Sequence, residues 1–230
     1  MMMLIIALVC GLLPGFAWLI FYLGEETHAE PKKLIAFTFI VGMAFGFFTV
    51  AIENIFSNWA SGIGVQEFSL LSLFGLAIIE EIMKFSAAHF AANKSPAFNE
   101  PVDAMIYMIV AALGFATLEN IGAISGIVPS ATLIPSVLQT VSLRFVGATL
   151  LHTLTSGIVG YYWARGIVKG KIKRYVASGL IIAAILHTTF NYFILTYGDA
   201  VYSVIFLMVV GFFVLNDFEK IKARPINLIV

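Results

Sequence analysis

The chain has 230 residues, of which 60% are hydrophobic and only 11% are charged, and its mean hydropathy is +0.99. A composition this apolar excludes a water-soluble globular protein and indicates an integral membrane protein. Thirteen basic residues balance thirteen acidic ones, so the chain lacks the positive charge excess that is typical of nucleic-acid-binding proteins.

Long apolar runs predict about seven transmembrane helices in a single integral-membrane domain, residues 1–230. The expected spans are 2–23, 33–56, 68–91, 102–127, 143–168, 175–197 and 200–215. Between 127 and 143, an apolar stretch interrupted by Pro129 and Pro135 predicts a short interfacial helix rather than another crossing. The expected fold class is therefore all-α, a polytopic helix bundle.

Basic residues fall on alternate connections between these spans. They gather at 32–33, 94, 169–174 and 220–224, whereas the intervening connections contain no lysine. By the positive-inside rule, the basic side is cytoplasmic. We therefore expect a multi-pass protein of the cell membrane with its N-terminus outside and its C-terminus in the cytoplasm.

The third predicted span carries two adjacent acids, Glu80 and Glu81, near the middle of the bilayer. An intramembrane acid costs about 2.5 to 3.5 kcal/mol, so such residues usually face the protein interior and serve a function. Lys84 lies one helical turn from both acids and can neutralise one of them. The other acid remains uncompensated, which favours a functional site over an ion pair that only fixes helix register.

Three further ionisable side chains are expected at a similar depth. At about 1.5 Å per residue, Glu80 lies about 18 Å below the predicted outer end of its helix. The others lie about 12 to 15 Å below theirs: Glu119, His152 and His187. Four helices thus bring polar groups into one layer, which predicts a single convergent site.

Two asparagines accompany this layer. Asn120 follows Glu119 directly, and Asn191 lies four residues after His187, where it can face the same cavity. Glu53, near the end of the second predicted span, is expected at the outer interface and outside the site. The candidate catalytic residues are Glu80, Glu81, Lys84, Glu119, Asn120, His152, His187 and Asn191.

Several segments resemble the PrsW-type intramembrane proteases, distant relatives of the CAAX-processing endopeptidases. The likeness begins with LLPGFAWLIFYLGEETHAEPKK at 12–33 and EEIMK at 80–84. It continues with EPVDAMIYMIVAALGFATLEN at 100–120, the helix of His152, and HTTFN at 187–191. The CAAX branch instead has EExxxR and FxxxH motifs, whereas here the basic residue is Lys84 and Glu119 stands at the histidine position, which argues against processing of prenylated peptides.

This resemblance implies peptide-bond hydrolysis within or beside the membrane. The implied active-site positions are Glu80, Glu81, Glu119, His152 and His187. The implied substrate is a membrane-anchored protein, for example an anti-sigma factor that is cut in a site-1-like cleavage. Buried acids and histidines also form ion pathways, so a small proton- or ion-coupled membrane transporter is the alternative function.

Two mechanisms of amide hydrolysis fit these residues. In the first, Glu80 or Glu81 takes a proton from water and returns it to the leaving amine. In the second, His152, His187 and Glu119 hold a zinc ion, and the acid pair supplies the base or a further ligand. The positive charge of a nearby lysine disfavours a bound cation, and both mechanisms remain open at this point.

Overall fold

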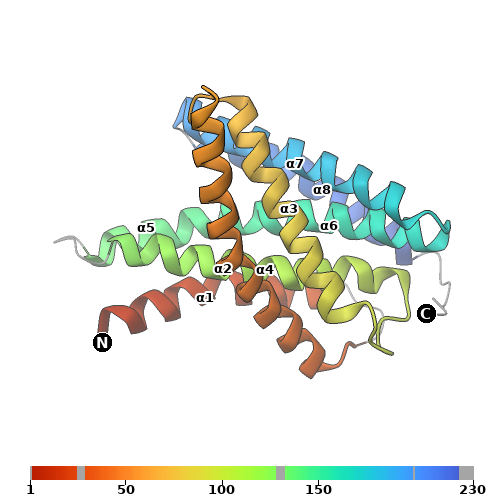
Figure 1. The fold of residues 1–230 in the computed structure, drawn as a ribbon. Coiled ribbons are helices and arrows are strands. Elements are labelled where there is room, and N and C mark those ends of the chain that lie inside the picture. The colour runs from red at the N-terminus through yellow and green to blue at the C-terminus, as the bar shows by residue number, and fades with distance from the viewer. Residues whose placement is uncertain (1, 25–28, 128–132, 199, 223–230) are drawn as a thin grey trace.

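The computed structural model describes residues 2–24, 29–127, 133–198 and 200–222, and these form helices joined by short connections, without strands. Figure 1 shows the arrangement. The helices are α1 (Met2–Leu23), α2 (Lys32–Gly62), α3 (Leu70–Ala92), α4 (Pro101–Ile127), α5 (Leu133–Val146), α6 (Ala148–Val168), α7 (Ile172–Tyr197) and α8 (Ala200–Lys222).

The helices confirm the prediction of an all-α polytopic membrane protein. Six segments of the described chain are long and apolar enough to cross a membrane: α1, α2, α4, α5 together with α6, α7 and α8. Helix α3 has 23 residues, the length of a further span, but it carries three charged residues near its middle. Those charges belong to the predicted site.

The short helix predicted between 127 and 143 is present as α5, which has 14 residues. A turn at Gly147 separates it from α6, so the span expected to begin at 143 is interrupted near its start. Pro129 lies outside the described residues, and Pro135 lies in the first turn of α5, where the absent N–H costs little. Trp18 Nε1 on α1 donates a hydrogen bond of 2.9 Å to the Phe145 carbonyl and ties α5 to the bundle.

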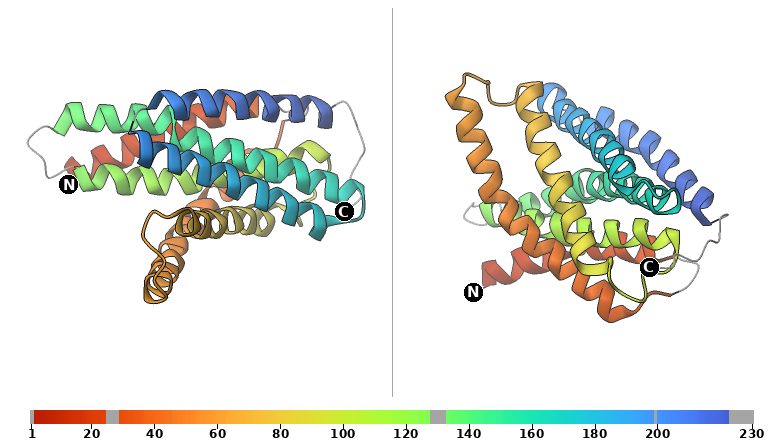
Figure 2. Two further views of the ribbon diagram at one scale, coloured as in Figure 1. Left: turned by 90° about the horizontal axis from the view of Figure 1, so that it is seen from above. Right: turned by 45° about the vertical axis from the view of Figure 1, so that its right-hand side comes forward.

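Helix α4 is the centre of the molecule. In its apolar stretch 94% of residues are buried, against 28–39% in the other five candidate spans. It contacts α1, α2, α3, α5, α6 and α8. Figure 2 shows α2 and α3 side by side, projecting from the bundle formed by the other helices. The acids of α3 therefore approach the centre of the bundle from one side.

Glycines allow two helices to come close to α4. A Cβ added at Gly114 of α4 would meet the Phe39 carbonyl oxygen of α2. A Cβ at Gly160 of α6 would lie 2.7 Å from the Ala104 carbonyl oxygen of α4. Small residues at such crossings permit close backbone approach within membranes. The result is that polar residues on α2, α4 and α6 lie within reach of one another.

Candidate functional site

The ammonium group of Lys84 lies closer to one of the two acids of α3 than to the other. Its Nζ lies 2.6 Å from Glu81 Oε1 and 3.7 Å from Glu80 Oε2. Glu81 and Lys84 are fully buried, whereas 12% of the Glu80 side chain is exposed. The Thr155 hydroxyl of α6 also donates a hydrogen bond of 3.1 Å to Glu81 Oε1. The geometry therefore agrees with the expectation that Lys84 compensates one acid, and that acid is Glu81.

Each buried histidine directs one ring nitrogen at a carboxylate. On α7, His187 Nδ1 lies 3.0 Å from Glu81 Oε1. On α6, His152 Nε2 lies 3.0 Å from Glu119 Oε2. A carboxylate at one ring nitrogen holds the proton there and leaves the other nitrogen free to accept a ligand.

The two remaining ring nitrogens face Glu80. Glu80 Oε2 lies 3.8 Å from both His152 Nδ1 and His187 Nε2. This oxygen is buried and has no hydrogen-bond partner among the described residues. A buried polar atom without a partner is costly, so its position between two nitrogens calls for a bound group.

These three atoms fit a metal ion. The ligand atoms offered by Glu80, His152 and His187 lie within 4.8 Å of one another, and all three residues are buried. Two imidazoles and one carboxylate on separate helices form a donor set that zinc commonly takes at catalytic sites. Lys84 Nζ lies 2.9 Å from His152 Nδ1, so this ammonium would have to turn toward its Glu81 partner when a cation binds.

Glu119 occupies a different position from the one expected of a metal ligand. Its Oε2 accepts a hydrogen bond of 2.9 Å from Arg144 Nη2 as well as contacting His152. Asn120 accepts a hydrogen bond from Arg144 Nε and donates one of 3.1 Å to Thr149 Oγ1. The structure thus places Glu80, not Glu119, beside His152 Nδ1 and His187 Nε2, because Glu119 lies against the far side of the His152 ring.

Most candidate residues meet in one cluster drawn from α3, α4, α6 and α7. The side chains joined by the contacts above are Glu80, Glu81, Lys84, Glu119, Asn120, His152 and His187. Asn191 is half-buried on α7, and no hydrogen bond among the described residues joins it to this cluster. Sequence reasoning missed Thr155, whose only signal is its place one helical turn after His152.

A cavity of about 310 Å³ adjoins the cluster between α2 and α4. Glu53 and Glu119 both line it, so the expectation that Glu53 lies outside the site at the outer interface is wrong. The reason is the length of α2, which extends to Gly62 instead of ending near residue 56. Glu53 consequently lies nine residues before the helix end, at a depth of about 14 Å, in the layer of the other acids.

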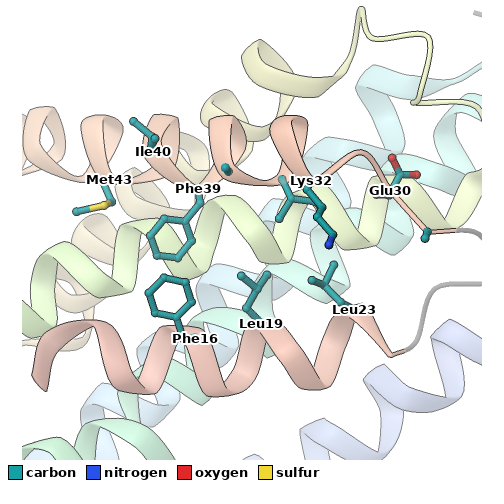
Figure 3. A pocket seen from close by; sticks show the side chains of 11 residues that line it. Phe16, Leu19, Leu23, Glu30, Lys32, Phe39, Ile40 and Met43 are labelled. Atoms are coloured by element: carbon teal, nitrogen blue, oxygen red, sulfur yellow. The ribbon is translucent and has the colours of Figure 1, made fainter. Parts of the chain in front are cut away.

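A larger cavity of about 550 Å³ lies between α1 and α2. Figure 3 shows its apolar walls, which include Phe16 and Phe39, and the charged Glu30 and Lys32 toward one end. None of the clustered histidines or acids of α3 and α4 lines it. We therefore locate the functional site by its chemistry, not by cavity size.

Comparisons with known proteins bear on this cluster. Residues 30–215 match the model of a family described as PrsW family intramembrane metalloprotease. The chain is 28% identical to Protease PrsW of Geobacillus kaustophilus over 220 residues, which cover 94% of this chain and 92% of the relative. It is 26% identical to Protease PrsW of Bacillus subtilis over 226 residues, 95% of each chain. No solved structure matches significantly.

Proposed function

Because the chain belongs to the PrsW family of intramembrane metalloproteases, we propose that it hydrolyses a peptide bond in a membrane-anchored protein, for example an anti-sigma factor, in a site-1-like cleavage. The main observation in support of this site is an arrangement that His152 and His187 have in common. Each has one ring nitrogen at a carboxylate and the other 3.8 Å from Glu80 Oε2, a buried oxygen that accepts no hydrogen bond from the described residues.

We assign the metal ligands to Glu80, His152 and His187, with zinc as the ion that this donor set favours. Glu81 and Glu119 orient the two imidazoles from behind, a role that carboxylates commonly have at metal sites. When bound, the ion supplies Lewis acidity that stabilises hydroxide and the developing oxyanion. The positions of the two orienting carboxylates support this assignment.

Hydrolysis also requires a group that takes a proton from the attacking water and passes it to the leaving amine. We assign this proton transfer to Glu119. It takes the proton as the water oxygen bonds to the carbonyl carbon, and it passes the proton to the amide nitrogen as the C–N bond breaks. Its side chain is 33% exposed and lines the cavity, and its contacts to His152 and Arg144 both use Oε2. The sequence favoured Glu80 or Glu81 as the base, but Glu80 faces His152 Nδ1 and His187 Nε2, and Glu81 is fully buried.

The test uses purified protein in lipid nanodiscs with a single-span substrate. We expect Glu80→Gln to lose both bound metal and cleavage, and Glu119→Gln to lose cleavage while it retains metal. The matched control is Glu67→Gln, an exposed acid between α2 and α3, which should change neither. Full cleavage by both site variants would contradict the assignment.

A second outcome would change the roles that we assign to Glu80 and to the metal. If metal-free protein cleaves normally and Glu80→Gln is inactive, Glu80 is the proton acceptor and the metal assignment is wrong. Elemental analysis of the same preparations, before and after treatment with a strong chelator, separates these results.

A further inference from the structure

The cavity between α2 and α4 contains an acid that the proposed mechanism does not use. Glu53 lies in its wall, and among the described residues no salt bridge joins Glu53 to a basic side chain. Two other carboxylates of the site each form a salt bridge with a basic side chain. Glu81 pairs with Lys84, and Glu119 pairs with Arg144.

Glu53 is close to the reacting groups. It lines the same cavity as Glu119, from the opposite helix. Glu119 also contacts His152, so the cavity and the buried cluster share a wall. A side chain that enters the cavity would therefore belong to a residue near the bond that is cleaved.

The rest of the cavity wall is mainly apolar. Phe47 and Val50 of α2 and Leu118 of α4 contribute to it. Phe47 and Val50 are also among the exposed hydrophobic residues, so the cavity lies beside the lipid-facing surface of α2. At about 310 Å³ it is near the lower end of the range for small-ligand sites.

We propose that this cavity is a specificity pocket that binds a lysine or arginine side chain of the substrate, with Glu53 as the counter-ion. The inference rests on the proposed protease function. A lysine or arginine stem packs on apolar surface while its charged end reaches a polar partner, which is the combination that these walls and Glu53 offer. Because an unpaired charge is costly inside a membrane, the pocket favours a basic side chain and rejects an acidic one.

The first test varies the charge of the substrate. A series of single-span substrates carries lysine, glutamine or glutamate at successive positions around the cleaved bond. At one position we expect kcat/KM for the lysine substrate to exceed that for the glutamine substrate by about tenfold, as for a partly desolvated ion pair. Glu53→Gln should bring this ratio toward one, and Glu53→Lys should make glutamate the preferred residue. An unchanged ratio in Glu53→Gln would overturn the proposal.

The second test fills the pocket. Gly122 lines the cavity, and a Cβ added there meets nothing within 4 Å, so Gly122→Phe should occupy the space without distorting α4. Gly126 has the same open surroundings one turn later and does not line the cavity, which makes Gly126→Phe a matched control. Gly122→Phe should lose most cleavage of the lysine substrate and keep its metal content, while Gly126→Phe keeps both. Equal activity of the two variants would contradict the pocket.

The outcomes separate this inference from the function on which it rests. Wild-type protein that cleaves none of the substrates contradicts the proposed function. Wild-type protein that cleaves the lysine, glutamine and glutamate substrates equally well contradicts the pocket alone, as expected if a lipid fills the cavity.

Discussion

Replacing Glu81 with glutamine tests how the buried charges of the site are held in the folded protein. Glu81 Oε1 lies 2.6 Å from Lys84 Nζ, 3.1 Å from the Thr155 hydroxyl and 3.0 Å from His187 Nδ1. Glutamine keeps the shape but leaves the fully buried Lys84 with Glu80, at 3.7 Å, as its remaining counter-ion. Removing one partner of a buried ion pair costs about 3 to 5 kcal/mol, and the nearby second acid places the expected loss near 3 kcal/mol.

The free energy of unfolding can be measured in bicelles by steric trapping. Glu80→Gln is the matched control, because its contact with Lys84 is longer and Lys84 keeps its closer partner Glu81, so we expect a smaller loss of about 1 kcal/mol. Adding Lys84→Met to Glu81→Gln removes the cation that has lost its closer partner and should recover at least half of the lost stability. The reasoning fails if Glu81→Gln is as stable as Glu80→Gln, or if the double variant is less stable than Glu81→Gln.

Three further outcomes are expected. His187→Gln should lose bound zinc, whereas Glu119→Gln, which removes the proposed base and an orienting carboxylate but no ligand, should still bind zinc at saturating concentration, with an affinity lowered by about 10- to 100-fold, as a chelator titration would show. Gly114→Leu should cost about 1 to 3 kcal/mol of unfolding free energy by forcing α2 away from α4, and a thermal melt in detergent checks this. In a background without the native cysteine, cysteine at Ser61 should react with an external reagent and cysteine at Lys171 should not; the reverse pattern would refute the orientation.

The convergence of the site could be predicted because depth along a membrane helix follows directly from sequence. Counting residues from the predicted helix ends placed Glu119, His152 and His187 in one layer. In the structure His152 contacts Glu119, and the ring centroids of His152 and His187 lie 5.3 Å apart. The same count failed for Glu53, because the end of α2 lies six residues beyond the predicted one. The error in the predicted end of α2 therefore led to the wrong expectation that Glu53, which lines the cavity, lies at the membrane interface.

Roles within the layer could not be predicted, because depth says nothing about how far a helix is rotated about its own axis. That rotation decides which carboxylate lies beside His152 Nδ1 and His187 Nε2, and this carboxylate is Glu80. The sequence suggested Glu119, with the pair of Glu80 and Glu81 as the base or a further ligand. The hydroxyl of Thr155 was missed for the same reason. The break at Gly147, which ends α5 near Arg144, likewise depends on tertiary contacts such as the ion pair between Arg144 and Glu119.

The ion pair between Lys84 and Glu81 also has a consequence for how the protein is made. Both residues belong to α3, one turn apart, so the pair can form as soon as this segment becomes helical. Synthesis proceeds from the N-terminus, and α3 leaves the ribosome before α6 and α7 exist to supply the histidines. A segment with two acids and one lysine therefore enters the bilayer with a single net negative charge, since it carries its own counter-ion. Insertion of α3 does not have to wait for the helices that later complete the site.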